Sequence, residues 1–77
     1  MNKQRRKYIA NAIVYLENAQ DIIETAKCEE EEAFYNLPDG IQCSERGEAM
    51  ETAIYNLENI FDSIQDALES ITEIVEN

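Results

Sequence analysis

Apolar residues recur in alternating steps of three and four along two long stretches of this 77-residue chain. The first stretch runs from about residue 3 to residue 36 and contains neither glycine nor proline. Its apolar stripe, interrupted by an acidic residue at Glu30, consists of Ile9, Ala12, Leu16, Ala19, Ile23, Ala26, Ala33 and Leu37. Such a rhythm is typical of an amphipathic helix that packs along one face. We therefore expect a first helix over about 3–36, roughly 50 Å long.

A break in the pattern follows the first stretch. Pro38 disfavours the helical conformation at Leu37, and Asp39-Gly40 is a common turn sequence. A second stretch then runs from about residue 45 to residue 76, with a stripe made of Met50, Ala53, Leu57, Ile60, Ile64, Ala67, Ile71 and Ile74. The pattern predicts a single all-α domain over 1–77, an antiparallel two-helix hairpin with its turn at 37–44.

The second stretch has a third apolar column, which recurs every seven residues and consists of Ile54, Phe61, Leu68 and Val75. A two-helix seam uses two positions in seven, so one partner helix would leave part of this face uncovered. Tyr8, Tyr15 and Ile22 widen the face of the first helix in the same way. We expect these residues to mediate self-association into a homodimeric four-helix bundle, because monomers rarely expose a continuous apolar strip. The alternative is a monomer whose strip contacts a different protein.

Alanine forms a column of its own in the first stretch, at seven-residue intervals: Ala12, Ala19, Ala26 and Ala33. Small side chains allow two helix axes to approach closely. We therefore expect this row to face the second helix of the hairpin.

Acidic residues dominate the charge, since 17 acids and 6 bases give a formal net charge of −11. Contacts to phosphate groups require lysine and arginine, so we expect no direct binding of nucleic acid or of an anionic membrane. No apolar run approaches the ~18 residues of a transmembrane helix. A basic N-terminus followed by apolar residues imitates a signal peptide, but Asn11 interrupts the run and the helical pattern continues beyond it. We expect a cytoplasmic protein.

The acids gather at the turn end of the predicted hairpin, where the nearby bases are Lys27 and Arg46. A solvated surface is the simplest interpretation. The functional interpretation is a docking surface for a protein partner with a basic surface, to which outward tyrosines would contribute contacts. The candidate partner-binding residues are Glu29, Glu30, Glu31, Glu32, Tyr35, Asp39, Glu45, Glu48, Glu51 and Tyr55.

Residues that carry common catalytic and metal chemistry are scarce. The chain has no histidine, which removes the usual base for a serine or cysteine nucleophile and a required ligand of di-iron bundles. Cys28 and Cys43 are expected to be free thiols, and Gly40 and Gly47 are isolated rather than part of a phosphate-binding loop. We therefore expect no catalytic residue, no bound metal, no cofactor and no enzymatic activity.

The segment 29–60 reads EEEEAFYNLPDGIQCSERGEAMETAIYNLENI. Its acidic run, its Asn-Leu-Pro turn, its Ser-Glu-Arg-Gly-Glu helix start and the basic N-terminus 1–7 resemble small helical-hairpin proteins of clostridial and related Gram-positive bacteria, often carried on phages or other mobile elements. The resemblance covers nearly the whole chain. It implies a bacterial or phage origin in the cytosol. Because that group has no established biochemical activity, the resemblance transfers no functional residue.

The leading hypothesis is a small, acidic, non-enzymatic interaction module that forms a homodimer and binds a further protein. The alternative is an inhibitor that imitates nucleic acid and blocks a DNA- or RNA-binding defence protein, of the anti-restriction or anti-CRISPR type. Net charge and small size favour that alternative. A third hypothesis is RNA binding on one helix face, for which the basic cluster at 3–7 is the only support.

Overall fold

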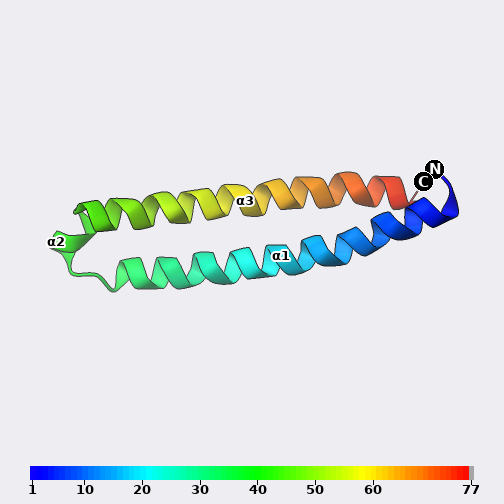
Figure 1. The fold of residues 1–77 in the computed structure, drawn as a ribbon. Coiled ribbons are helices and arrows are strands. Elements are labelled where there is room, and N and C mark those ends of the chain that lie inside the picture. Colours follow the sequence, from blue (N-terminus) through cyan, green and yellow to red (C-terminus); the bar gives the residue numbers. More distant parts are fainter. Residues whose placement is uncertain (77) are drawn as a thin grey trace.

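The structure is a computed structural model that describes residues 1–76, and it has the form of a rod (Figure 1). Helix α1 spans Lys3–Tyr35 and helix α3 spans Glu45–Glu76, with the four-residue helix α2, Asp39–Gln42, between them. α1 and α3 run antiparallel, so the start of α1 and the end of α3 lie at one end of the rod and α2 lies at the other. The rod measures 58 × 14 × 13 Å across its Cα atoms. The predicted all-α class is confirmed, and the described residues contain no strand.

Local hydrogen bonds explain where α1 begins and ends. At its start the Asn2 side-chain oxygen accepts a hydrogen bond from the Arg5 N–H at 2.9 Å, an N-cap that the apolar pattern does not predict. At its end the Asn36 N–H donates to the Glu32 carbonyl at 3.1 Å. Pro38 then has φ −57° and ψ 146°, which carries the chain away from the helix axis.

The connection contains a short helix rather than a simple turn. The N–H groups of Ile41 and Gln42 donate to the Pro38 carbonyl at 2.9 and 3.0 Å. The Gln42 side chain donates from Nε2 to the carbonyl oxygens of Phe34 and Leu37, each at 3.2 Å. The backbone bonds therefore form α2, and the Gln42 side chain holds it against the end of α1.

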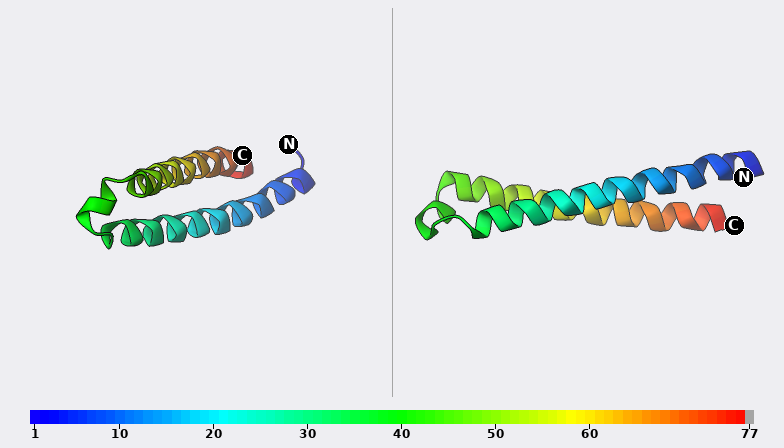
Figure 2. Two further views of the ribbon diagram at one scale, coloured as in Figure 1. Left: turned by 60° about the vertical axis from the view of Figure 1, so that its left-hand side comes forward. Right: turned by 90° about the horizontal axis from the view of Figure 1, so that it is seen from below.

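α1 and α3 lie side by side along the rod and cross over one another (Figure 2). Their contact is a seam of mostly half-buried residues in alternating steps of three and four on both helices. On α1 the seam consists of Ile9, Ile13, Leu16, Gln20, Ile23, Lys27, Glu30 and Phe34. On α3 it consists of Met50, Ile54, Leu57, Phe61, Ile64, Leu68, Ile71 and Val75. Leu68, at 8% exposed, is the most deeply buried apolar side chain among the described residues.

The seam on α3 differs from the predicted one by a column. The residues that the sequence analysis assigned to self-association on this helix lie in the seam instead: Ile54, Phe61, Leu68 and Val75. Ile60 and Ile74, which were predicted to face α1, are 44% and 40% exposed. The physical reason is apolar area, because a column of large side chains buries more surface than a column in which every second residue is alanine.

The alanine row of α1 does not fill the seam, contrary to the prediction. Ala12 and Ala19 are half-buried at its edge, whereas Ala26 and Ala33 are exposed. The residue that follows each alanine lies in the seam, and each of these residues has a larger side chain. The alanines therefore lie along one flank of the rod.

A polar contact crosses the middle of the seam. Gln20 on α1 donates from Nε2 to Gln65 Oε1 at 2.9 Å and to the Phe61 carbonyl oxygen at 3.5 Å. A polar group in an apolar seam makes its bonds only when the two helices are aligned in one register. Gln20 therefore helps to fix how α1 is aligned along α3.

Gln20→Leu is expected to raise the stability of the hairpin by about 1 kcal/mol, because an apolar side chain replaces a half-buried amide in the seam. Thermal unfolding followed by circular dichroism measures this change. Asn18→Leu is the control, since Asn18 is exposed on α1 outside the seam and its replacement should change stability by less than about 0.5 kcal/mol. A lower melting temperature for Gln20→Leu would show that the amide pair contributes more than apolar burial at this position.

Gly47 allows α3 to pack closely against the connection. It is buried, and an added Cβ would overlap the Gln42 carbonyl and lie 2.7 Å from the Ile41 carbonyl oxygen. Gly40, in α2, has open space at the same position, and no glycine of the described chain has a positive φ. What Gly47 provides is therefore room for two backbone segments rather than an unusual backbone angle.

Candidate functional site

A groove opens between α1 and α3 near the α2 end of the rod. It has a volume of about 280 Å³ and is lined by Glu31, Phe34, Tyr35, Glu51, Ile54, Tyr55 and Glu58. Three of these residues lie near the end of α1 and four lie in the first half of α3. We name these seven residues the acidic aromatic groove.

Helix periodicity and the antiparallel arrangement together assemble the groove. Glu51, Tyr55 and Glu58 follow one another at steps of four and three, so they project from one side of α3. Glu31 and Tyr35 are four residues apart and project from one side of α1. Because both rows line the groove, they must lie on the same flank of the rod.

The floor of the groove is apolar. Phe34 and Ile54 are half-buried seam residues. The rings of Phe34 and Tyr35 meet edge to face, with centroids 5.6 Å apart and an interplanar angle of 69°. Tyr35 is 71% exposed and Tyr55 is 64% exposed. Two accessible tyrosines therefore stand beside an apolar surface that a partner side chain can cover.

The groove carries negative charge. Lys27 pairs with Glu31 over one turn of α1, with Nζ 3.8 Å from Oε1, but both side chains are partly exposed and such pairs are weak. Glu51 and Glu58 are exposed on α3. The last turn of α1 has no basic residue, so the partial negative charge at the carbonyl end of the helix is not offset there. The groove is therefore suited to a cation.

Only part of the predicted partner-binding surface comes together in this groove. Glu31, Tyr35, Glu51 and Tyr55 line it. The other predicted residues lie outside the lining and are exposed, apart from one half-buried residue, Glu30 in the seam: Glu29, Glu30, Glu32, Asp39, Glu45 and Glu48.

Three residues of the groove were not predicted as partner-binding residues. Glu58 follows Glu51 by seven residues, and this spacing places both on one side of a helix, a signal that was available in the sequence. Ile54 was assigned to self-association, and Phe34 was not assigned to a site. Phe34 and Ile54 line the groove because their columns form the seam. The apolar pattern alone does not determine which columns form it.

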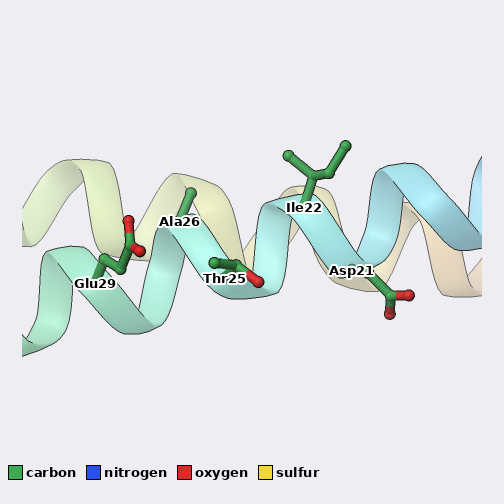
Figure 3. Close-up of a pocket in the computed structure, with 5 residues that line it drawn as sticks. All are labelled: Asp21, Ile22, Thr25, Ala26 and Glu29. Atoms are coloured by element: carbon green, nitrogen blue, oxygen red, sulfur yellow. The ribbon is translucent and has the colours of Figure 1, made fainter.

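A second, shallow hollow lies over Ala26 on α1 (Figure 3). It has a volume of about 340 Å³, and Asp21, Ile22, Thr25 and Glu29 complete its lining. Figure 3 shows Ile22 and Ala26 pointing to the same side of α1, whereas Asp21 points away from them. The hollow exists because alanine leaves space between larger neighbours.

The remaining features concern thiols, metals and membranes. Cys28 and Cys43 are exposed free cysteines. Within residues 1–76, the acids and cysteines form no cluster that could hold a metal ion. In the same part of the chain, no helix combines the length and the apolar character needed to cross a bilayer.

Comparison with protein-family models, with curated proteins and with solved structures gives no match to this chain.

Proposed function

We propose that this protein is a non-enzymatic interaction module whose acidic aromatic groove binds a basic segment of a protein partner. The observation that carries the proposal is the lining itself, which combines three carboxylates with two accessible tyrosines over an apolar floor. Arginine and lysine side chains bind carboxylates through charge-assisted hydrogen bonds and aromatic faces through cation–π contacts. One long basic side chain can make both kinds of contact in this groove.

The size and openness of the groove favour a side chain over a free small molecule. Its volume of about 280 Å³ falls just below the roughly 300–1,000 Å³ of pockets that enclose small ligands. The alkyl part of an arginine or lysine packs against apolar surface while the charged end stays near polar groups. Phe34 and Ile54 offer the apolar surface, and Glu51 and Glu58 offer the carboxylates.

A nucleic-acid-mimicking inhibitor is the second candidate function. It is favoured by the continuation of acids along the same flank of α1, where Glu17 and Glu24 precede Glu31 at seven-residue steps, roughly 10 Å apart along a helix. The resemblance to proteins of phages and mobile elements fits a role against a defence protein. In this case total negative charge along the rod, rather than the tyrosines, would determine binding.

The groove proposal is tested with a fluorescein-labelled oligoarginine peptide, whose binding is followed by fluorescence anisotropy at near-physiological salt. The groove variant carries Glu31→Gln, Glu51→Gln and Glu58→Gln. The matched variant carries Glu17→Gln, Asp66→Asn and Glu73→Gln, which removes the same charge at exposed positions outside the groove. The groove variant should raise the peptide Kd about tenfold and the matched variant less than about threefold.

The tyrosines separate the groove from simple charge attraction. Tyr35→Ala together with Tyr55→Ala leaves the charge unchanged and should raise the peptide Kd about fivefold. Equal weakening by the two charge variants, with no effect of the tyrosine changes, would contradict the groove proposal and support mimicry. Because the changed side chains are mostly exposed, helicity by circular dichroism should stay the same in all variants.

A further inference from the structure

We propose that a second copy of this chain packs against the flank of the rod opposite the groove and forms a four-helix bundle with it. The surface consists of other residues than the groove, and its proposed role does not depend on what the groove binds. The proposed self-association surface lies on columns that differ in part from those expected from the apolar pattern.

The position of the groove determines which columns share the opposite flank. Glu31 of α1 and Glu51 and Glu58 of α3 line one groove, so the columns that contain them border the seam on the same side. Each helix has one further column beside the seam, and these two must border it on the other side. On α1 this is the alanine row, and on α3 it is the column that contains Ile60 and Ile74.

This flank is uncharged over most of the length of the rod, although 30% of the chain is charged. On α1 it extends outward to the next column and comprises Tyr8, Ala12, Tyr15, Ala19, Ile22 and Ala26. On α3 it comprises Asn56, Ile60, Ser63, Ala67, Ser70 and Ile74. We name these twelve residues the uncharged face. Arg5 and Glu29 stand just beyond its two ends on α1.

Large apolar side chains are exposed on the uncharged face. Tyr8, Tyr15 and Ile22 on α1 are 61%, 74% and 68% exposed. Ile60 and Ile74 on α3 are the other two large apolar residues of the face. Its polar members suit a covered surface, since the Ser63 hydroxyl already donates to the Asn59 carbonyl of its own helix at 2.9 Å.

The exposed area of the chain exceeds that of a compact monomer by about the area that one dimer contact would remove. The chain exposes 5747 Å² at a mass of 8.9 kDa, whereas folded monomers of that mass expose about 4,800 Å². The excess is roughly 900 Å², and each partner in a standard interface buries about 800 Å². One contact between two copies along the uncharged face would therefore remove from each chain an area close to this excess.

The shape of the face favours a second copy as the occupant. Large side chains alternate with alanines along α1, and on α3 three small residues, Ser63, Ala67 and Ser70, separate Ile60 from Ile74. A two-fold axis can place the large side chains of one copy against the small ones of the other, which is how helices interlock in bundles. The hollow of about 340 Å³ borders this face through Ile22 and Ala26, and its other lining residues lie outside the face. A face without charges needs no complementary charge on its partner.

The test is the molar mass in solution, measured by sedimentation equilibrium over a range of concentrations. The unmodified chain should reach twice its mass of 8.9 kDa. Tyr15→Glu and Ile60→Glu, each on the uncharged face, should each raise the dimer Kd more than tenfold, because a buried unpaired carboxylate is costly. Val14→Glu is the matched control, since Val14 is also exposed but lies outside the face, and it should raise the dimer Kd less than about threefold.

Each outcome decides a separate point. A chain that stays monomeric at every concentration would contradict the proposal that two copies form a dimer. If neither Tyr15→Glu nor Ile60→Glu weakens the dimer, the uncharged face is not its interface. Unchanged helicity in the variants shows that a loss of mass reflects dissociation rather than unfolding. Binding of the oligoarginine peptide tests the groove independently, because none of these three substitutions touches its lining.

Discussion

Leu68→Ala is expected to lower the free energy of unfolding by about 2–3 kcal/mol, near the lower end for leucine truncation in a core. Leu68 is the apolar side chain of the described chain that is buried most completely, at 8% exposed. Its neighbours in the seam are only half-buried. Since small domains have a marginal core, losing this side chain removes a large part of the stability.

Urea unfolding followed by circular dichroism, at one fixed protein concentration, measures the effect. The concentration must be fixed because dimerisation would add to the apparent stability. Val14→Ala is the control, because Val14 is exposed and truncation there should cost less than about 0.5 kcal/mol. Equal losses at the two positions would mean that the seam does not contain the stabilising contact assigned to Leu68.

Gly47→Ala is the substitution with the second large expected effect, a loss of about 1–3 kcal/mol from overpacking. The added methyl group would overlap the Gln42 carbonyl, so α2 must move away from α3. Gly40→Ala should act in the opposite direction. It has open space and no positive φ, so restricting the unfolded chain should stabilise the fold by about 0.4–1 kcal/mol.

The two glycine variants are compared by thermal unfolding, with the melting temperature as the measured quantity. Helix propensity alone would make both substitutions stabilising, because alanine is the better helix former. A rise in melting temperature for Gly47→Ala would therefore show that α2 does not pack against α3 as described. A loss at Gly47 with a gain at Gly40 would confirm that the close approach of the two backbones is specific to Gly47.

Much of the fold follows from local signals in the sequence. The three-four spacing of apolar residues predicts both long helices, and Pro38 with the following Asp-Gly sequence predicts the break between them. The N-cap at Asn2 and the bonds of Gln42 to the end of α1 were not predicted. They depend on side chains that reach backbone groups, and many residues of the same type never do so.

The choice of seam was harder to predict than the helices. On α3 the column with Met50 and Leu57 can combine with the column on either side of it, and both combinations give a three-four pattern. The apolar stripe selected the column with Ile60, whereas the structure uses the one with Phe61. The difference arises from packing against α1, which local periodicity does not contain.

The same uncertainty limited the prediction of the groove. The acidic residues and the accessible tyrosines were identified from helix periodicity, so Tyr35 and Tyr55 were expected on the surface. Phe34 and Ile54 became part of the groove only because their columns meet in the seam. Prediction of a surface between two helices therefore requires the register and rotation of both helices, not the polarity of either one.

The slender shape of the rod has a consequence for its hydrodynamics. A body that is 58 Å long and 14 Å wide experiences more friction than a sphere of equal mass. A single hairpin therefore migrates in gel filtration like a heavier globular protein. Side-by-side pairing along the uncharged face would make the particle relatively thicker and lower its frictional ratio, whereas end-to-end association would raise it. Sedimentation velocity thus reports how two copies are arranged as well as whether they associate.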